Sequence, residues 1–206
     1  MRLPIASEGW PLILPGFALA VLCALLHWRA AAAGAFALAL FVTWFFRDPA
    51  RVIPADPAAI VSPADGKVVV VEPGAAGAQI SIFLSVFNVH VNRTPVAGEV
   101  VAVERHAGKF LAAWNHAAST ENARASVTVR TPRGDVRFVQ VTGLIARRIV
   151  CHLAPGDRVE RGERYGLIRF GSRVDLFLPP GAEPAVRIGD RLRGGADVIA
   201  RWRDAA

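Results

Sequence analysis

Two apolar runs open the chain, and a different pattern follows them. Residues 11–28 and 30–46 are almost continuously apolar, with only a short interruption around Arg29. Each run is about 17 residues long, close to the shortest helix that crosses a bilayer, and tryptophans lie at or near the run ends, as at membrane interfaces. The pattern predicts a hydrophobic membrane anchor over residues 1–50, formed by one hairpin or two short helices.

The charges around these runs favour one orientation of the anchor. A hairpin places both of its ends on the same side of the membrane. Arg2, Arg47 and Arg51 flank the ends and favour the cytoplasmic side, whereas Arg29 in the interruption favours the opposite side. We therefore expect residues 51–206 to lie on the cytoplasmic face.

After residue 50 the pattern changes to short apolar runs separated by glycine and proline. Residues 136–141 alternate between apolar and polar side chains, which is typical of a half-buried strand. Many short strands predict a mainly β catalytic domain over residues 51–206, arranged as a β-sandwich. Strands are expected at 67–71, 79–87, 99–105, 126–130, 136–142, 144–151, 165–170, 174–178 and 185–188.

One local segment refines this fold class. Residues 155–163 read as a Gly-Asp turn, a short strand and a second glycine turn. The segment resembles the hairpins of biotinyl and lipoyl carrier domains, so the expected fold is barrel-sandwich-hybrid-like. No modifiable lysine lies at a hairpin tip, so the carrier function is not expected.

The charge balance indicates an anionic partner. The formal net charge is +7, and Lys67 and Lys109 are the only lysines, so nearly all cations are arginines. Arginine suits an anionic membrane surface or a phosphorylated substrate, although a compositional bias of the source genome gives the same count. The chain carries no nucleic-acid-binding motif and no histidine spacing typical of a metal site. We expect no nucleic-acid partner and no metal.

The dipeptide Gly171-Ser172 has two interpretations. Between two predicted strands it is an ordinary turn, because glycine and serine both favour turns. Under strain, the Ser172 hydroxyl attacks the Gly171 carbonyl carbon and shifts the acyl group from nitrogen to oxygen. Elimination and hydrolysis then leave a pyruvoyl group.

A longer run around this dipeptide resembles a known family. Residues 162–179, Gly-Glu-Arg-Tyr-Gly-Leu-Ile-Arg-Phe-Gly-Ser-Arg-Val-Asp-Leu-Phe-Leu-Pro, resemble the maturation segment of short bacterial phosphatidylserine decarboxylase proenzymes. Residues 61–66, 87–95 and 121–124 are similar to three further family motifs, in the same order. Longer members often carry Leu-Gly-Ser-Thr where this chain has Phe-Gly-Ser-Arg.

The resemblance implies a self-made cofactor. It implies cleavage between Gly171 and Ser172 into a β chain (1–171) and an α chain (172–206) that stay associated. Ser172 becomes a covalent pyruvoyl group, His90 takes the serine proton, and Asp65 orients the imidazole. The pyruvoyl group forms a Schiff base with phosphatidylserine, which is decarboxylated to phosphatidylethanolamine in phospholipid biosynthesis. The implied location is the bacterial inner membrane.

Alternatives remain open at the sequence level. The substrate is phosphatidylserine or a related serine phospholipid. A membrane-tethered binding module without chemistry stays intact, as does a serine hydrolase using Asp65, His90 and Ser172, which lacks the Gly-x-Ser-x-Gly elbow. Arg147 and Arg148 bind the phosphodiester or form a solvated pair. The sequence leaves the oligomeric state open, a homo-oligomer included.

Overall fold

The computed structural model describes residues 4–74, 77–109, 111, 121–143, 148–169 and 172–203. Two compact units divide the chain, Met1–Ala50 and Arg51–Ala206. Each unit is described by itself.

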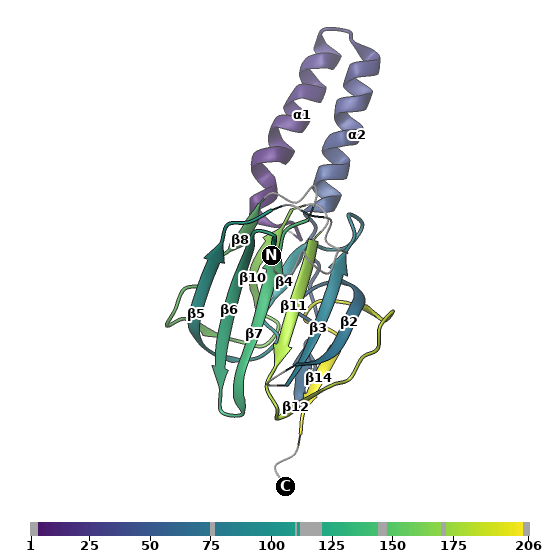
Figure 1. The fold of residues 1–206 in the computed structure, drawn as a ribbon. Helices are drawn as coiled ribbons and strands as arrows, with labels where there is room; N and C mark the ends of the chain where they lie inside the picture. Colours follow the sequence, from purple (N-terminus) through teal and green to yellow (C-terminus); the bar gives the residue numbers. More distant parts are fainter. Residues whose placement is uncertain are drawn as a thin grey trace. The chain divides into compact units, whose positions relative to one another are not determined.

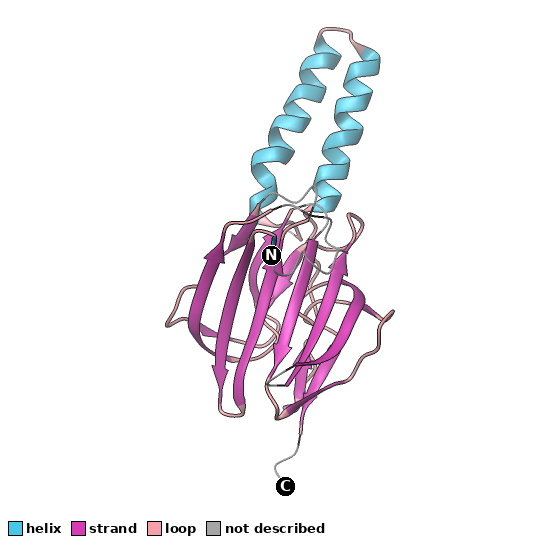
Figure 2. Ribbon diagram, in the orientation of Figure 1, coloured by secondary structure: helices cyan, strands magenta, loops and turns pink. Residues whose placement is uncertain are grey.

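The first unit is a pair of antiparallel helices (Figures 1 and 2). A 3₁₀ turn, Ser7–Gly9, leads into α1 (Trp10–Leu25), and α2 (Arg29–Phe45) follows a tight turn. His27 closes this turn in the left-handed region, with φ 59°, while the Trp28 amide bonds back to the Cys23 carbonyl. The predicted helical segment therefore takes the form of a hairpin.

Small side chains let the two helices approach closely. A β-carbon added at Gly16 of α1 would lie 3.2 Å from the Ala39 β-carbon of α2, and the Phe17 and Phe36 rings meet edge to face at 5.8 Å. The segment Ser7–Leu25, with mean hydropathy 1.7, is long and apolar enough to cross a membrane, whereas α2 is shorter.

The second unit is built from short strands. In chain order they are β1 (Ala59–Val61), β2 (Gly66–Gly74), β3 (Gly77–Leu84), β4 (Val91–Arg93), β5 (Gly98–His106), β6 (Arg124–Thr131), β7 (Gly134–Val141), β8 (Ile149–Cys151), β9 (Arg158–Val159), β10 (Arg164–Ile168), β11 (Ser172–Leu178), β12 (Ala182–Pro184), β13 (Arg191–Leu192) and β14 (Val198–Trp202). The mainly β fold class is confirmed, together with N-terminal apolar helices.

These strands form one large sheet and two small ones. The large sheet has the order β13-β2-β3-β11-β7-β6-β5-β9, and all of its pairs are antiparallel. It curls into a half-barrel (Figure 1). The small sheets have the orders β4-β10-β8 and β1-β14-β12. Strand β11 is therefore a central strand, with β3 on one side and β7 on the other.

The core lies against the inner face of the large sheet. Alternate residues of β11 and β7, such as Val174, Leu176, Val136 and Phe138, point into one apolar cluster that also contains Tyr165 of β10. The Phe138 and Tyr165 rings lie 4.9 Å apart. The alternation seen in the sequence thus corresponds to an inner and an outer sheet face.

One predicted strand is wrong. Residues 185–188 do not form a strand; the strand in this region is β12, and a turn follows it. The Arg187 amide donates to the Asp190 carboxylate, and Gly189 has φ 103°, so turn chemistry overrides the apolar residues nearby. Of the strand predicted at 144–151, residues 149–151 form β8, and residues 144–147 lie outside the described residues.

A candidate active site at one end of the curled sheet

Ser172 begins the central strand β11, and its side chain is fully buried. It pairs with Leu84 of β3, and the register with β7 places Thr142 opposite it on the other side. Across the described residues, its hydroxyl oxygen has no hydrogen-bond partner. A buried hydroxyl without a partner costs roughly 1–3 kcal/mol, so such a group calls for a functional explanation. Gly171, the other half of the predicted cleavage site, lies outside the described residues.

His90 is held in a defined tautomer. Its side chain is buried, and Nδ1 lies 2.9 Å from the Asn88 carbonyl oxygen. Because a carbonyl oxygen only accepts, Nδ1 carries the hydrogen, and Nε2 of the neutral ring is then the proton acceptor. The Asn88 carbonyl thus orients the ring.

Hydrogen bonds connect the segment that contains His90 to the inner face of the large sheet. Asn92 of β4 accepts a hydrogen bond from Gln140 of β7 at 2.8 Å, which joins the small sheet to the inner face of the large one. His90 lies two residues before Asn92 and continues its ladder, since the Ile168 amide donates to the His90 carbonyl. Side chains two residues apart share a face, and β10 ends at Ile168, just before β11 begins.

Asp65 lies at the same end of the large sheet. It precedes β2, whose Lys67 pairs with Phe83 of β3, so Asp65 lies just beyond the level of Leu84 and Ser172. Its carboxylate accepts two hydrogen bonds from Arg51, at 2.8 and 2.9 Å, and one from the Gly194 amide at 2.7 Å. The chain thus places all three described residues of the predicted set at one end of the sheet.

Sequence reasoning missed a buried ion pair beside Ser172. Arg173 donates through Nε to Asp175 at 2.5 Å and through Nη2 to the Ser81 hydroxyl of β3 at 2.7 Å. Both charged side chains are almost fully buried, at 3% and 2% exposed, and they lie on the sheet face opposite Ser172. The signal in the sequence was an opposite-charge pair two residues apart within a predicted strand.

Burial also raises the pKa values of two side chains, one on β10 and one on β8. Burial raises the pKa of the Tyr165 phenol well above its usual value, and Cys151 shifts it in the same direction. Burial likewise raises the pKa of the Cys151 thiol. Both groups are therefore neutral near pH 7 and add no charge to the interior.

An ion pair borders the loop that contacts Asp65. Burial acts to raise the pKa of Asp197, but hydrogen bonds from Arg193 outweigh it and hold that pKa below 3.8. Arg193 immediately precedes Gly194, whose amide binds Asp65. The Asp197 carboxylate thus stays ionised at neutral pH and fixes the loop.

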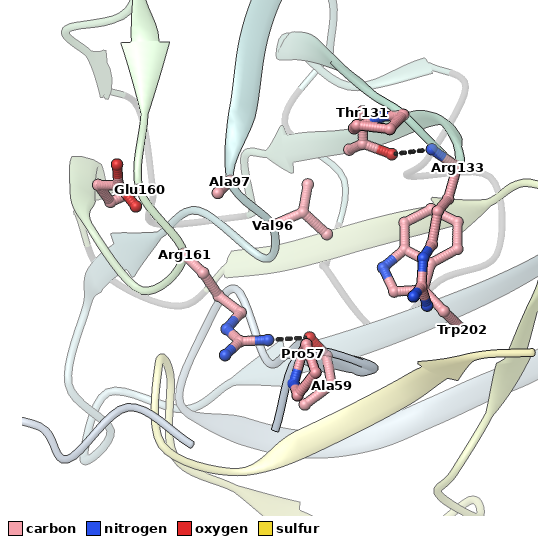
Figure 3. Close-up of a pocket in the computed structure, with 10 residues that line it drawn as sticks. Pro57, Ala59, Val96, Ala97, Thr131, Arg133, Glu160, Arg161 and Trp202 are labelled. Carbon is pink, nitrogen blue, oxygen red and sulfur yellow. Dashed lines mark hydrogen bonds between the residues drawn. The ribbon is translucent and has the colours of Figure 1, made fainter. Parts of the chain in front are cut away.

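A separate pocket lies at the opposite end of the sheet. It has a volume of about 290 Å³ and is lined by Val96, Arg133, Glu160 and Trp202, among others (Figure 3). Arg161 on its wall donates to the backbone carbonyls of Asp56 and Ala59, each at 2.7 Å. None of the sequence-predicted site residues lines this pocket.

The other arginines considered from sequence do not define a site. Arg148 is exposed, and its carbonyl accepts a bond from the Arg169 amide at 3.2 Å. Arg147 lies outside the described residues. Within the described part of the chain, no cluster of three or more His, Cys, Asp or Glu side chains is arranged to hold a metal.

Comparisons with known proteins agree with the resemblance seen in the sequence. The family model described as phosphatidylserine decarboxylase matches residues 38–200. A phosphatidylserine decarboxylase proenzyme of Symbiobacterium thermophilum is 52% identical over 98% of this chain and 97% of its own length. Proenzymes of the same name from Pelobacter propionicus and Nitrosomonas eutropha are 47% and 45% identical, covering 96% and 97% of this chain and 96% and 95% of their own lengths.

Proposed function

This chain belongs to the phosphatidylserine decarboxylase family, and from that premise we propose that it is a proenzyme that cleaves itself between Gly171 and Ser172 and then decarboxylates phosphatidylserine to phosphatidylethanolamine. The observation that carries the proposal is Ser172, a fully buried serine whose hydroxyl has no partner among the described residues. His90 is buried as well, with Nδ1 on the Asn88 carbonyl oxygen.

Self-cleavage follows from ordinary acyl chemistry. The Ser172 hydroxyl oxygen attacks the Gly171 carbonyl carbon, the His90 Nε2 takes the hydroxyl proton, and the peptide C–N bond breaks to leave an ester. Loss of the Ser172 α-proton expels the Gly171 carboxylate and leaves dehydroalanine. One water then replaces the nitrogen, which departs as ammonia, and residue 172 ends as a pyruvoyl group.

The surroundings of residue 172 fit such a group. The position is buried and the hydroxyl that would be consumed makes no hydrogen bond within the described residues, so its loss costs the fold little. A pyruvoyl group at residue 172 would supply a ketone able to condense with the substrate amine, with loss of water, and an electron sink for the decarboxylation. His90 lies on the face from which a proton is returned to the product.

Asp65 acts in this proposal as a positioning residue. Its carboxylate joins Arg51 to the Gly194 amide, which ties the segment before β1 to the loop after β13 at this end of the sheet. The Asn88 carbonyl already sets the His90 tautomer, so Asp65 has a different role in this proposal. Its carboxylate fixes the loop at Gly194 and places a negative charge at this end of the sheet.

The strand order supports a stable complex of the two cleaved chains. The α chain would consist of β11 to β14. Strand β11 lies between β3 and β7, β13 pairs with β2, and β14 pairs with β1. Every one of these partners belongs to residues 1–171, so cleavage breaks one covalent bond and leaves the sheets paired.

The first unit supplies the membrane attachment. An apolar helical hairpin suits a substrate whose acyl chains stay in the bilayer, and the flanking arginines favour the cytoplasmic face of the inner membrane. The formal net charge of the chain is +7, which also favours binding to anionic lipid.

Intact-mass measurement of the purified protein tests the proposal. We expect two chains, residues 1–171 and 172–206, the second lighter by one ammonia than a serine-ended chain. Ser172→Ala is expected to remain one inactive chain because the nucleophile is absent. Ser126→Ala, which removes another buried serine of the large sheet, is the matched control and should cleave normally. An active wild-type protein of one uncut chain contradicts the proposal.

A further inference from the structure

Four adjoining strands each direct an unpartnered buried polar atom into the described interior. They are Asn92 Nδ2 of β4, Gln140 Oε1 of β7, Tyr165 OH of β10 and Ser172 Oγ of β11. All four side chains are fully buried, at 0% exposed. Native interiors pair the large majority of such atoms, so several together indicate a place where a polar ligand is received.

The orientation of the two amides is fixed by a backbone carbonyl. Gln140 Nε2 lies 2.8 Å from Asn92 Oδ1 and 3.3 Å from the Val150 carbonyl oxygen. Only a nitrogen can donate to that carbonyl, so the Gln140 nitrogen faces it, and the Asn92 atom beside it must be the accepting oxygen. The amide pair therefore keeps one free donor, Asn92 Nδ2, and one free acceptor, Gln140 Oε1.

The register places this pair beside residue 172. Gln140 is paired with Val174, so it lies diagonally across β7 and β11 from Ser172. Diagonal neighbours on one sheet face are about 7–8 Å apart, within reach of a glutamine side chain and a small headgroup bonded at residue 172. Asn92 touches Gln140 and lies two residues from His90. The donor and the acceptor thus flank the position where the chemistry is proposed.

We propose that Asn92 and Gln140 form the subsite for the amino-acid end of the lipid headgroup, an inference that rests on the proposed function. Asn92 Nδ2 donates to the carboxylate, and Gln140 Oε1 accepts from the amine. An amino acid presents those two groups on one carbon, which matches a donor and an acceptor held side by side. The subsite makes Asn92 a specificity residue, because ethanolamine headgroups lack the carboxylate that it binds.

Neutral amides suit a carboxylate that must be lost. A cation would stabilise the carboxylate in the ground state and withdraw that stabilisation as carbon dioxide departs, which raises the barrier. An amide donor orients the group with a smaller ground-state effect. Two cations at this end of the sheet already bind other groups: Arg173 binds Asp175 and Ser81, and Arg51 binds Asp65.

The test compares two lipids that differ only in the carboxylate. Asn92→Leu removes the Nδ2 donor, together with the Oδ1 that accepts from Gln140, and keeps the number of side-chain heavy atoms. Asn122→Leu is the matched control, because Asn122 is also fully buried but its amide is saturated by Leu111 and the Thr142 carbonyl. Intact mass establishes self-cleavage of each variant first. The mature proteins are then reduced with borohydride, which stops turnover, and their binding of short-chain phosphatidylserine and phosphatidylethanolamine is measured by calorimetry.

We expect the reduced wild-type protein to prefer phosphatidylserine. Asn92→Leu should weaken phosphatidylserine binding about 10- to 100-fold and leave phosphatidylethanolamine binding within about twofold, because one hydrogen bond to a charged group is lost. The unreduced variant should lose a similar factor in kcat/KM. Asn122→Leu should lower the melting temperature and change binding of both lipids equally.

Other results overturn the inference in distinguishable ways. Unchanged affinities of Asn92→Leu for both lipids mean that a trapped water, and not the headgroup, meets these amides. Equal loss of both lipids makes Asn92 merely structural. If Asn92→Leu fails to fold, Asn92→Asp keeps the acceptor for Gln140 and should show the same selective loss, recovering as acid protonates the new carboxyl. An uncleaved wild-type protein, seen by mass before lipid is added, contradicts the proposed function itself.

Discussion

Two buried polar side chains, Ser172 and His90, differ in their hydrogen-bond partners. Ser172 is enclosed without a hydrogen-bond partner in the described structure, whereas the Nδ1 atom of His90 is committed to the Asn88 carbonyl. A serine hydroxyl is a weak nucleophile until a base removes its proton. Because the Asn88 carbonyl holds the hydrogen on Nδ1, our proposal assigns the role of base to Nε2.

The role of His90 is testable at this scale. We expect His90→Ala to slow self-cleavage by about 10²- to 10⁴-fold, since a positioned general base contributes that much. The extent of cleavage with time is followed by intact mass, and circular dichroism monitors the fold. His106→Ala, which removes an exposed histidine of β5, should cleave like the wild type. Normal cleavage of His90→Ala would remove His90 from the proposed set.

At the scale of one element, β11 is unusual because both of its faces are buried. Ser172, Val174 and Leu176 face the core, while Arg173 and Asp175 form their ion pair on the other face. A buried charge is tolerated only when it is paired, and Arg173 also bonds to Ser81 of β3. The ion pair thus joins the first residues of the proposed α chain to a strand of the β chain.

This ion pair leads to a prediction about stability. Arg173→Met should destabilise the protein by up to about 3–5 kcal/mol, because the buried Asp175 carboxylate loses the charge of its Arg173 partner. The double variant Arg173→Met with Asp175→Leu should recover most of that loss, since no buried charge remains. Chemical denaturation of the three proteins gives the free energies of unfolding. A double variant less stable than Arg173→Met would mean that the pair itself stabilises the strand.

At the scale of the whole molecule, the chain combines an apolar helical hairpin with a β-rich unit that has its own core. The hairpin leaves large apolar side chains exposed, including Leu14, Leu19, Leu22 and Leu38. Such a surface is unfavourable in water and favourable in a bilayer. The two units therefore suit two different solvents.

Membrane attachment through the hairpin is the last prediction. Leu19 and Leu22 of α1 are each 53% exposed. Replacing both by lysine in the full chain should release the protein from vesicles, because each lysine costs about 2.5–3.5 kcal/mol at the centre of a membrane helix. Flotation with vesicles measures the bound fraction, and a double isoleucine variant should float like the wild type. Undiminished flotation of the lysine variant would place the attachment elsewhere in the chain.

The sequence by itself determined the two apolar helices and most of the longer strands, and it predicted three candidate residues with their motif. Apolar runs and alternation are local patterns, and they fix the secondary structure because backbone hydrogen bonding and burial repeat every few residues. The strand predicted at residues 185–188 is wrong, because a turn bond from the Arg187 amide to the Asp190 carboxylate outweighs the apolar side chains there. A local sequence pattern was sufficient to predict an element wherever no competing local interaction opposed it.

Only the tertiary structure decided what surrounds those residues. Arg51 meets Asp65, Asn92 meets Gln140 and Arg173 meets Ser81 across 14, 48 and 92 positions of sequence. Such contacts depend on strand order, register and the curl of the sheet. Together these bring segments that are distant in sequence to the same level and the same face of the sheet. A local pattern states that a side chain is buried, but the long-range pairing of strands determines which polar group it meets.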